Sequence, residues 1–197
     1  DGASAFVPGV DFADPSTWGN LANGLTRPLF ARLHPLGTAY KGGFTVAAGD
    51  VNGDGFADVI AGTGGGVTGR VVVFDGLTHT RLGPALTPFG AGYTGGVNLA
   101  AGDVNGDGTD ELVVSTAAGL ARVRTYHLAG SGFAAFGPVL SPFGALPVGL
   151  QVTALDANGD GIAEIAAGAL DGGVVRVRVV TATGSTVGAF TAGTGVT

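Results

Sequence analysis

One nine-residue pattern recurs at a fixed interval, and this recurrence limits the possible folds of the chain more than any other feature. The pattern is D-x-N-x-D-G-x-x-[DE], and its copies begin at Asp50, Asp103 and Asp156, a spacing of 53 residues in both cases. A constant interval of this length is typical of a repeated structural unit. The sequence therefore predicts an array of similar units, each with one such loop.

The segments around the loop follow the same order in every unit. A first strand rich in small residues precedes the loop, a second apolar strand follows it, and a glycine-rich turn leads to a third strand of β-branched residues. A fourth strand is expected to end near Pro88-Phe89-Gly90 and Pro142-Phe143-Gly144, and only residues 186–191 are left to supply it in the last unit. The first strands are predicted at residues 44–48, 97–101 and 150–154, the second at 59–61, 112–114 and 165–167, and the third at 70–74, 122–126 and 175–179.

Four short strands in each interval, without any helical period, predict an all-β fold made of β-propeller blades. A β-solenoid is the competing all-β architecture, but its repeats are usually shorter. A further partial unit is predicted before the first loop, because residues 29–37 match residues 82–90 one interval later. We expect a leader and partial blade at 1–42, and full blades of four antiparallel strands at 43–95, 96–148 and 149–197.

The number of units is small for a closed ring. Propellers usually have about four to eight blades, whereas this sequence carries three full units and a partial one. An open array would leave apolar blade faces exposed, which favours aggregation. We therefore expect neighbouring blades from a longer chain, or self-association of copies of this chain. The chain contains no methionine, and we expect it to be a mature form or a piece of a longer protein.

Composition excludes several classes of protein. The chain has no cysteine, so disulfides and thiolate metal sites are excluded. Its 45% hydrophobic content is too high for a disordered chain, and 39 glycines fit many tight turns between short strands. No apolar run is long enough to span a membrane, and the nine Lys and Arg residues form no run that would bind nucleic acid.

Each loop has the composition of a site for a hard divalent cation, which indicates Ca²⁺. Oxygen-bearing side chains occupy positions 1, 3, 5 and 9, the main-chain carbonyl of position 7 is a further ligand, and a glycine at position 6 allows the tight turn. Nine of the 15 acidic residues lie at positions 1, 5 and 9, and three Ca²⁺ ions would balance the formal charge of −6. The expected ligands of the three Ca²⁺ sites are Asp50, Asn52, Asp54, Phe56 and Asp58; Asp103, Asn105, Asp107, Thr109 and Glu111; and Asp156, Asn158, Asp160, Ile162 and Glu164.

Other interpretations of the loop fit the sequence less well. An EF-hand requires a bidentate Glu at position 12 and flanking helices, but position 12 is Ala61, Val114 or Ala167 and the flanks are β-rich. A turn rich in Asp and Asn that binds no metal is the remaining alternative, and three in-phase copies count against it. Because catalysis in a propeller normally breaks the symmetry at one place, three similar loops predict a structural metal and no enzyme activity.

Two pairs of arginines alternate along predicted third strands, so that each pair faces one side of its sheet. They are Arg122 with Arg124 and Arg176 with Arg178. The pairs form either a cationic stripe for an acidic glycan or carboxylate, or ordinary contacts with solvent and neighbouring blades. Trp18 and Tyr40 are, in the same way, either sugar-stacking or packing residues.

The first strand, the loop and the apolar strand after it resemble the FG-GAP and VCBS repeats, which occur in integrin α-subunit propellers and in many secreted bacterial proteins. The resemblance covers roughly residues 28–191. It implies a propeller in which each cation loop joins the first and second strands of a blade. It also implies a non-catalytic Ca²⁺-binding module for binding or adhesion, with a protein or carbohydrate ligand.

We expect such a module to act outside the cell or at the cell surface, because Ca²⁺ is abundant there and suits weak cation loops. The main alternative is an accessory or scaffold domain of a secreted enzyme, such as a polysaccharide-degrading protein. A propeller that is itself a polysaccharide lyase is a third alternative, and the absence of a unique acid–base cluster counts against it.

Overall fold

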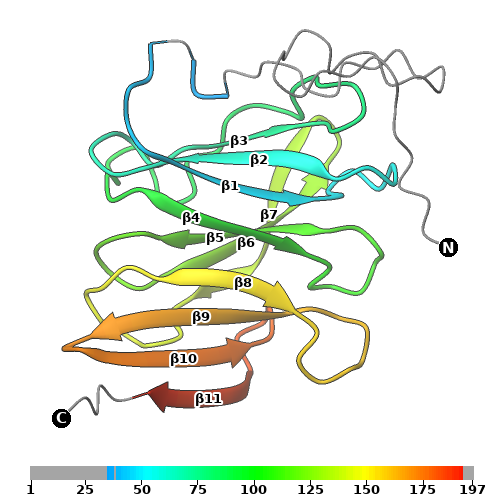
Figure 1. Ribbon diagram of the computed structural model, residues 1–197. Helices are drawn as coiled ribbons and strands as arrows, with labels where there is room; N and C mark the ends of the chain where they lie inside the picture. The colour runs from blue at the N-terminus through cyan, green and yellow to red at the C-terminus, as the bar shows by residue number, and fades with distance from the viewer. Residues whose placement is uncertain (1–34, 38, 193–197) are drawn as a thin grey trace, which may run out of the picture. The chain divides into compact units, whose positions relative to one another are not determined.

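β-strands account for all the regular secondary structure in the part of the chain that the computed structural model describes, residues 35–37 and 39–192 (Figure 1). Glycine-rich turns separate the strands, and 17 of the 18 glycines with positive φ lie after residue 50. The all-β prediction is therefore confirmed. Residues 1–34, which include Trp18 and most of the leader and partial blade predicted at 1–42, lie outside the described residues.

The strands form three antiparallel sheets, and the strands of each sheet are hydrogen-bonded in chain order. The predicted first, second and third strands are all present, with ends that differ by a few residues. The sheets are compatible with a partial propeller with four-stranded blades. The first sheet contains β1 (Phe44–Gly49), β2 (Asp58–Thr63) and β3 (Val71–Phe74); the second contains β4 (Val97–Gly102), β5 (Glu111–Thr116), β6 (Val123–Ala129) and β7 (Gly132–Leu140); the third contains β8 (Gln151–Leu155), β9 (Glu164–Asp171), β10 (Val174–Val180) and β11 (Thr186–Ala192).

The first sheet lacks a regular fourth strand, so this part of the prediction is wrong. The segment predicted to pair with β3 makes only two isolated bridges, Val71 with Leu86 and Phe74 with Arg81. Between these bridges lie Gly83, which has a φ of +71°, and Pro84, which has no N–H to donate. β7 contains the same pair, Gly137 and Pro138, and pairs with β6 on both sides of it through a register shift. What differs in the first sheet is the length of β3, which ends at Phe74 and is followed at once by a turn, so few residues remain to pair with the fourth segment.

Side chains alternate along each strand, so each sheet has two faces. We call the face that packs on the next sheet along the chain the forward face, and the opposite one the rear face. The forward face of the first sheet (Thr45, Ala47, Gly49, Ile60, Gly62, Val71 and Val73) packs on the rear face of the second (Val97, Leu99, Ala101, Leu112, Val114 and Tyr126). The forward face of the second sheet (Asn98, Ala100, Gly102, Val113, Ser115 and Val123) packs on the rear face of the third (Leu150, Val152, Ala154, Ile165, Ala167 and Val180).

Small residues in the first strands bring neighbouring sheets close together. A Cβ added at Gly49 would lie 2.5 Å from the Cβ of Ala101, and one added at Gly102 would lie 2.6 Å from that of Ala154. Polar side chains cross the same gap, because Thr45 donates to the carbonyl of Val97 (2.9 Å) and Asn98 donates to that of Leu150 (2.7 Å). The small residues of the first strands, together with Gly49 and Gly102 at their ends, thus set the separation of the sheets.

Candidate metal centre

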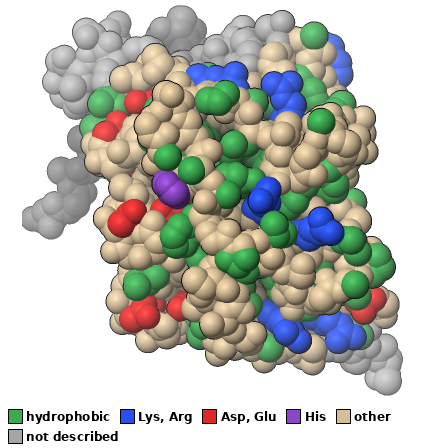
Figure 2. Space-filling model, turned by 180° about the vertical axis from the view of Figure 1, so that it is seen from behind, with side chains coloured by type: hydrophobic (Ala, Val, Ile, Leu, Met, Phe, Trp, Pro, Cys, Tyr) green, Lys and Arg blue, Asp and Glu red, His purple; other side chains and the backbone are tan. Residues whose placement is uncertain are grey.

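Each predicted cation loop joins the first and second strands of its sheet, and the three loops lie along one edge of the stack (Figure 1). Main-chain hydrogen bonds connect them in a row. Asp110 donates its N–H to the carbonyl of Asp50 (2.9 Å), and Ala163 donates to the carbonyl of Asp103 (2.7 Å). Acidic side chains gather along the corresponding edge in Figure 2, whereas most basic side chains lie away from it.

The aspartate at position 1 organises the main chain of its own loop. One carboxylate oxygen of Asp50 accepts the N–H groups of Gly53 (2.7 Å) and Asp54 (3.1 Å), and the other accepts that of Gly55 (2.8 Å). A carboxylate has about four acceptor positions on its two oxygens, so these three bonds leave capacity on the oxygen that accepts only Gly55. The same three bonds are made by Asp103 and by Asp156.

Two glycines in each loop adopt the left-handed conformation that these bonds require. Positions 4 and 6 have φ angles between +75° and +86° in all three loops. A residue with a Cβ is strained there. From the sequence, only position 6 was predicted to need glycine. The residues are Gly53, Gly55, Gly106, Gly108, Gly159 and Gly161.

The asparagine at position 3 lies between two carboxylates. In the second loop the side-chain oxygen of Asn105 accepts the N–H of Asp107 (2.8 Å), while its amide group donates to Asp107 (2.9 Å) and to Glu111 (2.8 Å). The third loop repeats the arrangement with Asn158, Asp160 and Glu164. The amide hydrogens therefore provide the positive partner that holds the carboxylates of positions 5 and 9 together.

The acid at position 9 is buried beneath the loop. Asp58 and Glu111 have no exposed surface, and Glu164 is nearly as buried. One oxygen of each accepts the N–H of position 2, at 2.9 to 3.0 Å. Burial, followed by the nearby charges of Asp107 and Asp103, raises the pKa of Glu111 to about 7. Burial also raises the pKa of Asp58. The buried carboxylates of Asp58 and Glu111 therefore have nearby acids and too little solvent to favour their charged form.

Asp75, which lies outside the predicted ligand set, completes the first loop. Asp58 is one methylene shorter than its counterpart Glu111, and one of its oxygens is engaged by the N–H of Gly76 (2.9 Å). The amide of Asn52 therefore donates to Asp54 (3.2 Å) and to Asp75 (3.3 Å). The only sequence signal was the aspartate in place of glutamate at position 9.

Asp110 is a second acid outside the predicted ligand set. It occupies position 8 of the second loop, where the other loops have alanine. Its carboxylate accepts the N–H of Asp50 (2.9 Å), in addition to the main-chain bond between the same two residues. Burial raises the pKa of Asp110, and the charges of Asp50 and Asp103 act in the same direction. The first two loops are thus joined more firmly than the second and third.

The residues at position 7 bond to the loop through their N–H groups. Phe56, Thr109 and Ile162 each donate to the carboxylate of position 5, at 2.8 to 2.9 Å. That their carbonyl oxygens bind a cation stays a prediction.

The donor chemistry of the loops fits a hard cation. Among the described residues, no group of three or more His, Cys, Asp or Glu side chains could hold a metal ion by itself. A site therefore also needs the asparagine side chain and main-chain oxygens. Oxygen-only ligands at positions 1, 3, 5 and 9 are those that Ca²⁺ prefers. A bound ion would supply the positive charge that the asparagine amide provides in this structure.

The arginine pairs make contacts within the fold. Arg124 donates to the carbonyl of Pro88 (3.0 Å) and lies over the ring of Tyr126, 5.8 Å from its centre. Arg178 lies at the same distance over Phe143, and Arg176 pairs with Asp171 (3.6 Å). Arg124 and Arg178 thus pack against the Pro-Phe-Gly segments, which favours ordinary contacts within the fold for these two residues.

Comparison with protein-family models finds the FG-GAP-like repeat twice, at residues 50–114 and 103–167. The two matches together cover more than half of the chain. The chain belongs to the FG-GAP-like repeat family. Each FG-GAP-like match begins at the first aspartate of one loop. It ends in the strand that directly follows the next loop, β5 for the first match and β9 for the second. The search of curated proteins finds no match.

Membership of the FG-GAP-like repeat family indicates a repeat domain of a generally non-enzymatic kind. Within residues 35–37 and 39–192 there is no helix with the length and apolar character that crossing a bilayer requires.

Proposed function

We propose that this chain is a calcium-stabilised, non-catalytic binding module of an exported protein, with a structural Ca²⁺ in each of its three loops. The observation that carries the proposal is the near-identity of the hydrogen bonds in the three loops, from the position 1 carboxylate to the buried acid at position 9. Three equivalent sites favour a structural role, because a catalytic metal requires one site that differs from the others and keeps an open position.

Ca²⁺ would act on the contact between sheets as well as on each loop. Without an ion, carboxylates at positions 1, 5 and 9 repel one another within a few residues. The first and second loops also accept a main-chain hydrogen bond from the next loop, through the carbonyls of Asp50 and Asp103. An ion that fixes one of these loops therefore also fixes the acceptor for the following sheet.

Removal of Ca²⁺ is expected to lower the melting temperature. With a Kd of ~0.1 mM and Ca²⁺ at ~2 mM, each occupied loop gains about 1.8 kcal/mol. For a domain of this size, each kcal/mol shifts Tm by about 2–4 °C. Differential scanning calorimetry in Ca²⁺ and in excess EDTA measures the effect, with Mg²⁺ at equal concentration as the ionic-strength control. An identical Tm in EDTA and in Ca²⁺ would refute the structural role.

Replacing Asp75 by alanine is expected to weaken the first site alone. The substitution removes the acid that Asn52 reaches in place of a long position 9 side chain. Isothermal titration with Ca²⁺ should then show one weakened site and two unchanged ones. Asp171→Ala is the matched control, because Asp171 is an acid that lies outside the loops and pairs with Arg176. Three unchanged sites in the Asp75 variant would show that this residue has no part in cation binding.

The ligand class that we propose is a protein or a carbohydrate. Export is supported by the exposure of the cation loops to solvent, because loops of this kind suit the millimolar Ca²⁺ found outside cells. Incubation with a panel of polysaccharides, in Ca²⁺ buffer, tests both the binding and the absence of catalysis. Retention without release of shorter products supports the proposal, and product formation would assign the chain to an enzyme.

A further inference from the structure

Asp110 belongs to the second loop, but its side chain contacts the first one. It occupies position 8, between the expected ligands Thr109 and Glu111. Its carboxylate accepts the N–H of Asp50 (2.9 Å), and its own N–H donates to the carbonyl of Asp50 (2.9 Å). Both main-chain groups of the position 1 aspartate of the first loop are therefore held by a residue of the next unit.

The glycine before Asp50 makes room for this contact. A Cβ added at Gly49 would lie 2.5 Å from a carboxylate oxygen of Asp110. A side chain at residue 49 would therefore push the carboxylate away from the N–H of Asp50. The counterpart of Gly49 in the second sheet is Gly102, where an added Cβ would lie 3.4 Å from the Cβ of Ala163. The same space is thus present one unit later, but no carboxylate occupies it.

No other loop has an acid at position 8. The residue is Ala57 in the first loop and Ala163 in the third. Ala163 donates its N–H to the carbonyl of Asp103 (2.7 Å), so the main-chain bond between neighbouring loops is repeated. Its methyl group cannot accept the N–H of Asp103. The carboxylate contact therefore distinguishes the junction of the first two loops from that of the second and third.

We propose that Asp110 is a positioning residue for Ca²⁺ binding at the first loop, an inference that rests on the calcium sites proposed above. It acts through Asp50, whose carboxylate accepts the N–H groups of three residues of its own loop. Fixing the main chain of Asp50 fixes the origin of this arrangement before an ion binds. Removal of a group that orients a metal ligand typically weakens metal binding by about 10–100-fold.

Asp110 also lies close to the first aspartate of its own loop. Burial raises the pKa of Asp110, and the charges of Asp50 and Asp103 raise it further, while the N–H groups of the same two residues act against the shift. One carboxylate therefore lies beside the position 1 residues of two loops. The hydrogen bond at 2.9 Å is to Asp50, so the larger effect is expected at the first loop.

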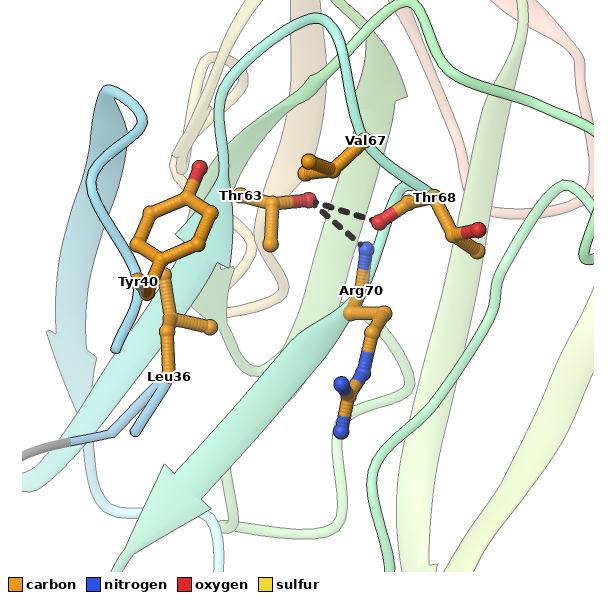
Figure 3. A pocket seen from close by; sticks show the side chains of 6 residues that line it. All are labelled: Leu36, Tyr40, Thr63, Val67, Thr68 and Arg70. Atoms are coloured by element: carbon orange, nitrogen blue, oxygen red, sulfur yellow. Dashed lines mark hydrogen bonds between the residues drawn. The ribbon is translucent and has the colours of Figure 1, made fainter. Parts of the chain in front are cut away.

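The opposite ends of the first and second sheets are joined by contacts that do not involve the loops. The turn between β2 and β3 is closed by Thr63, whose hydroxyl donates to the carbonyl of Thr68 (3.1 Å) and accepts the N–H of Arg70 (2.9 Å) (Figure 3). From this turn, Gly66 and Gly69 donate to carbonyls of the segment before the second sheet, at 2.9 and 2.8 Å. The sheets should therefore stay together when the position 8 acid is replaced, and affinity can be measured in the folded protein.

A Ca²⁺ titration followed by NMR tests the proposal loop by loop. The position 6 glycine of each loop donates its N–H to the position 1 carboxylate, so the amide signals of Gly55, Gly108 and Gly161 report the three loops separately. In Asp110→Ala we expect the Kd for Ca²⁺ at the first loop to rise about tenfold. The second loop should change less, and the third should keep the Kd that it has in the unmodified protein.

Asp110→Asn separates positioning from charge. Its side-chain oxygen can still accept the N–H of Asp50, so the first loop should recover most of its affinity. Asp171→Ala is the control for the loss of one acid, because Asp171 lies outside the loops and pairs with Arg176. It should leave all three titration curves unchanged.

Four results would overturn the positioning role. They are an unchanged first loop in the alanine variant, an equal loss at all three loops, an asparagine variant as weak as the alanine variant, and a control that loses affinity at the first loop. In each of these cases the unmodified protein still binds Ca²⁺, and the proposed function stands. An unmodified protein in which no glycine signal responds to Ca²⁺ would instead refute the calcium sites themselves, and the role of Asp110 with them.

Discussion

Gly149→Ala is expected to reduce the free energy of unfolding by about 3 kcal/mol, because it forces a methyl group into a backbone contact. Gly149 immediately precedes Leu150 and β8, and a Cβ at this position would lie far inside van der Waals contact with the carbonyl of Ala117. That carbonyl cannot withdraw easily. The N–H of Ala117 donates to the carbonyl of Gly96 (3.0 Å), and the N–H of Leu150 donates to the carbonyl of Thr116 (2.8 Å), so the main chain on both sides of the contact is held in place. The substitution therefore separates the third sheet from the second.

Chemical denaturation in Ca²⁺ buffer measures this effect, and Gly92→Ala is its control. A methyl group at Gly92 would have no atom within 4 Å, and the residue has no positive φ. Its replacement should leave stability unchanged or raise it by about 0.4–1 kcal/mol through the unfolded chain. Equal midpoints for the two variants would show that the contact at Gly149 relaxes without cost.

Glu111→Ala is expected to cost about 3 kcal/mol in metal-free buffer, since a fully buried side chain is removed and two donors lose their acceptor. The carboxylate of Glu111 accepts the N–H of Val104 (3.0 Å) and the amide of Asn105 (2.8 Å). The disfavoured ionisation of this buried acid offsets part of the loss. In addition, the stabilisation that Ca²⁺ provides should fall by the contribution of one of the three loops.

Glu111→Gln separates the packing role of this residue from its proposed role as a ligand. Glutamine keeps the shape and one acceptor, so the metal-free protein should lose only about 1 kcal/mol. The removed charge should still weaken Ca²⁺ binding at the second loop. Thermal denaturation of both variants, with and without Ca²⁺, gives the comparison. Full Ca²⁺ stabilisation in the glutamine variant would exclude Glu111 as a ligand.

The strands next to the loops could be predicted because their pattern is local and repeated. Loop, first strand and second strand follow one another within a few residues, so three copies in register are enough to place them. The fourth strand of the first sheet could not be predicted by repetition. The Gly-Pro pair at Gly83-Pro84 recurs as Gly137-Pro138 inside β7, so the repeat predicts a strand in both units, and the difference lies in the shorter β3, which ends at Phe74.

The loop residues divide in the same way. That the side chains of positions 1, 3, 5 and 9 lie close together could be predicted from spacing alone, because the main chain of a short loop brings them together. Asp75 lies 17 residues after Asp58, and only the fold of β2 and β3 returns it to Asn52. Asp110 was visible in the sequence, but its role depends on how closely the first and second sheets approach.

The glycines at the closest approach of the sheets also control the curvature of the array. Stacked sheets lie about 10 Å apart when ordinary side chains separate them. Gly49 and Gly102 let neighbouring sheets approach more closely than this at their first strands. Each pair of sheets therefore forms a wedge that is thinnest at the first strands. Leu155 occupies the same position in the third sheet, and a side chain of that size between two sheets would reduce the angle of the wedge. One position in each repeat therefore sets the angle between blades, and with it the number of blades that complete a circle.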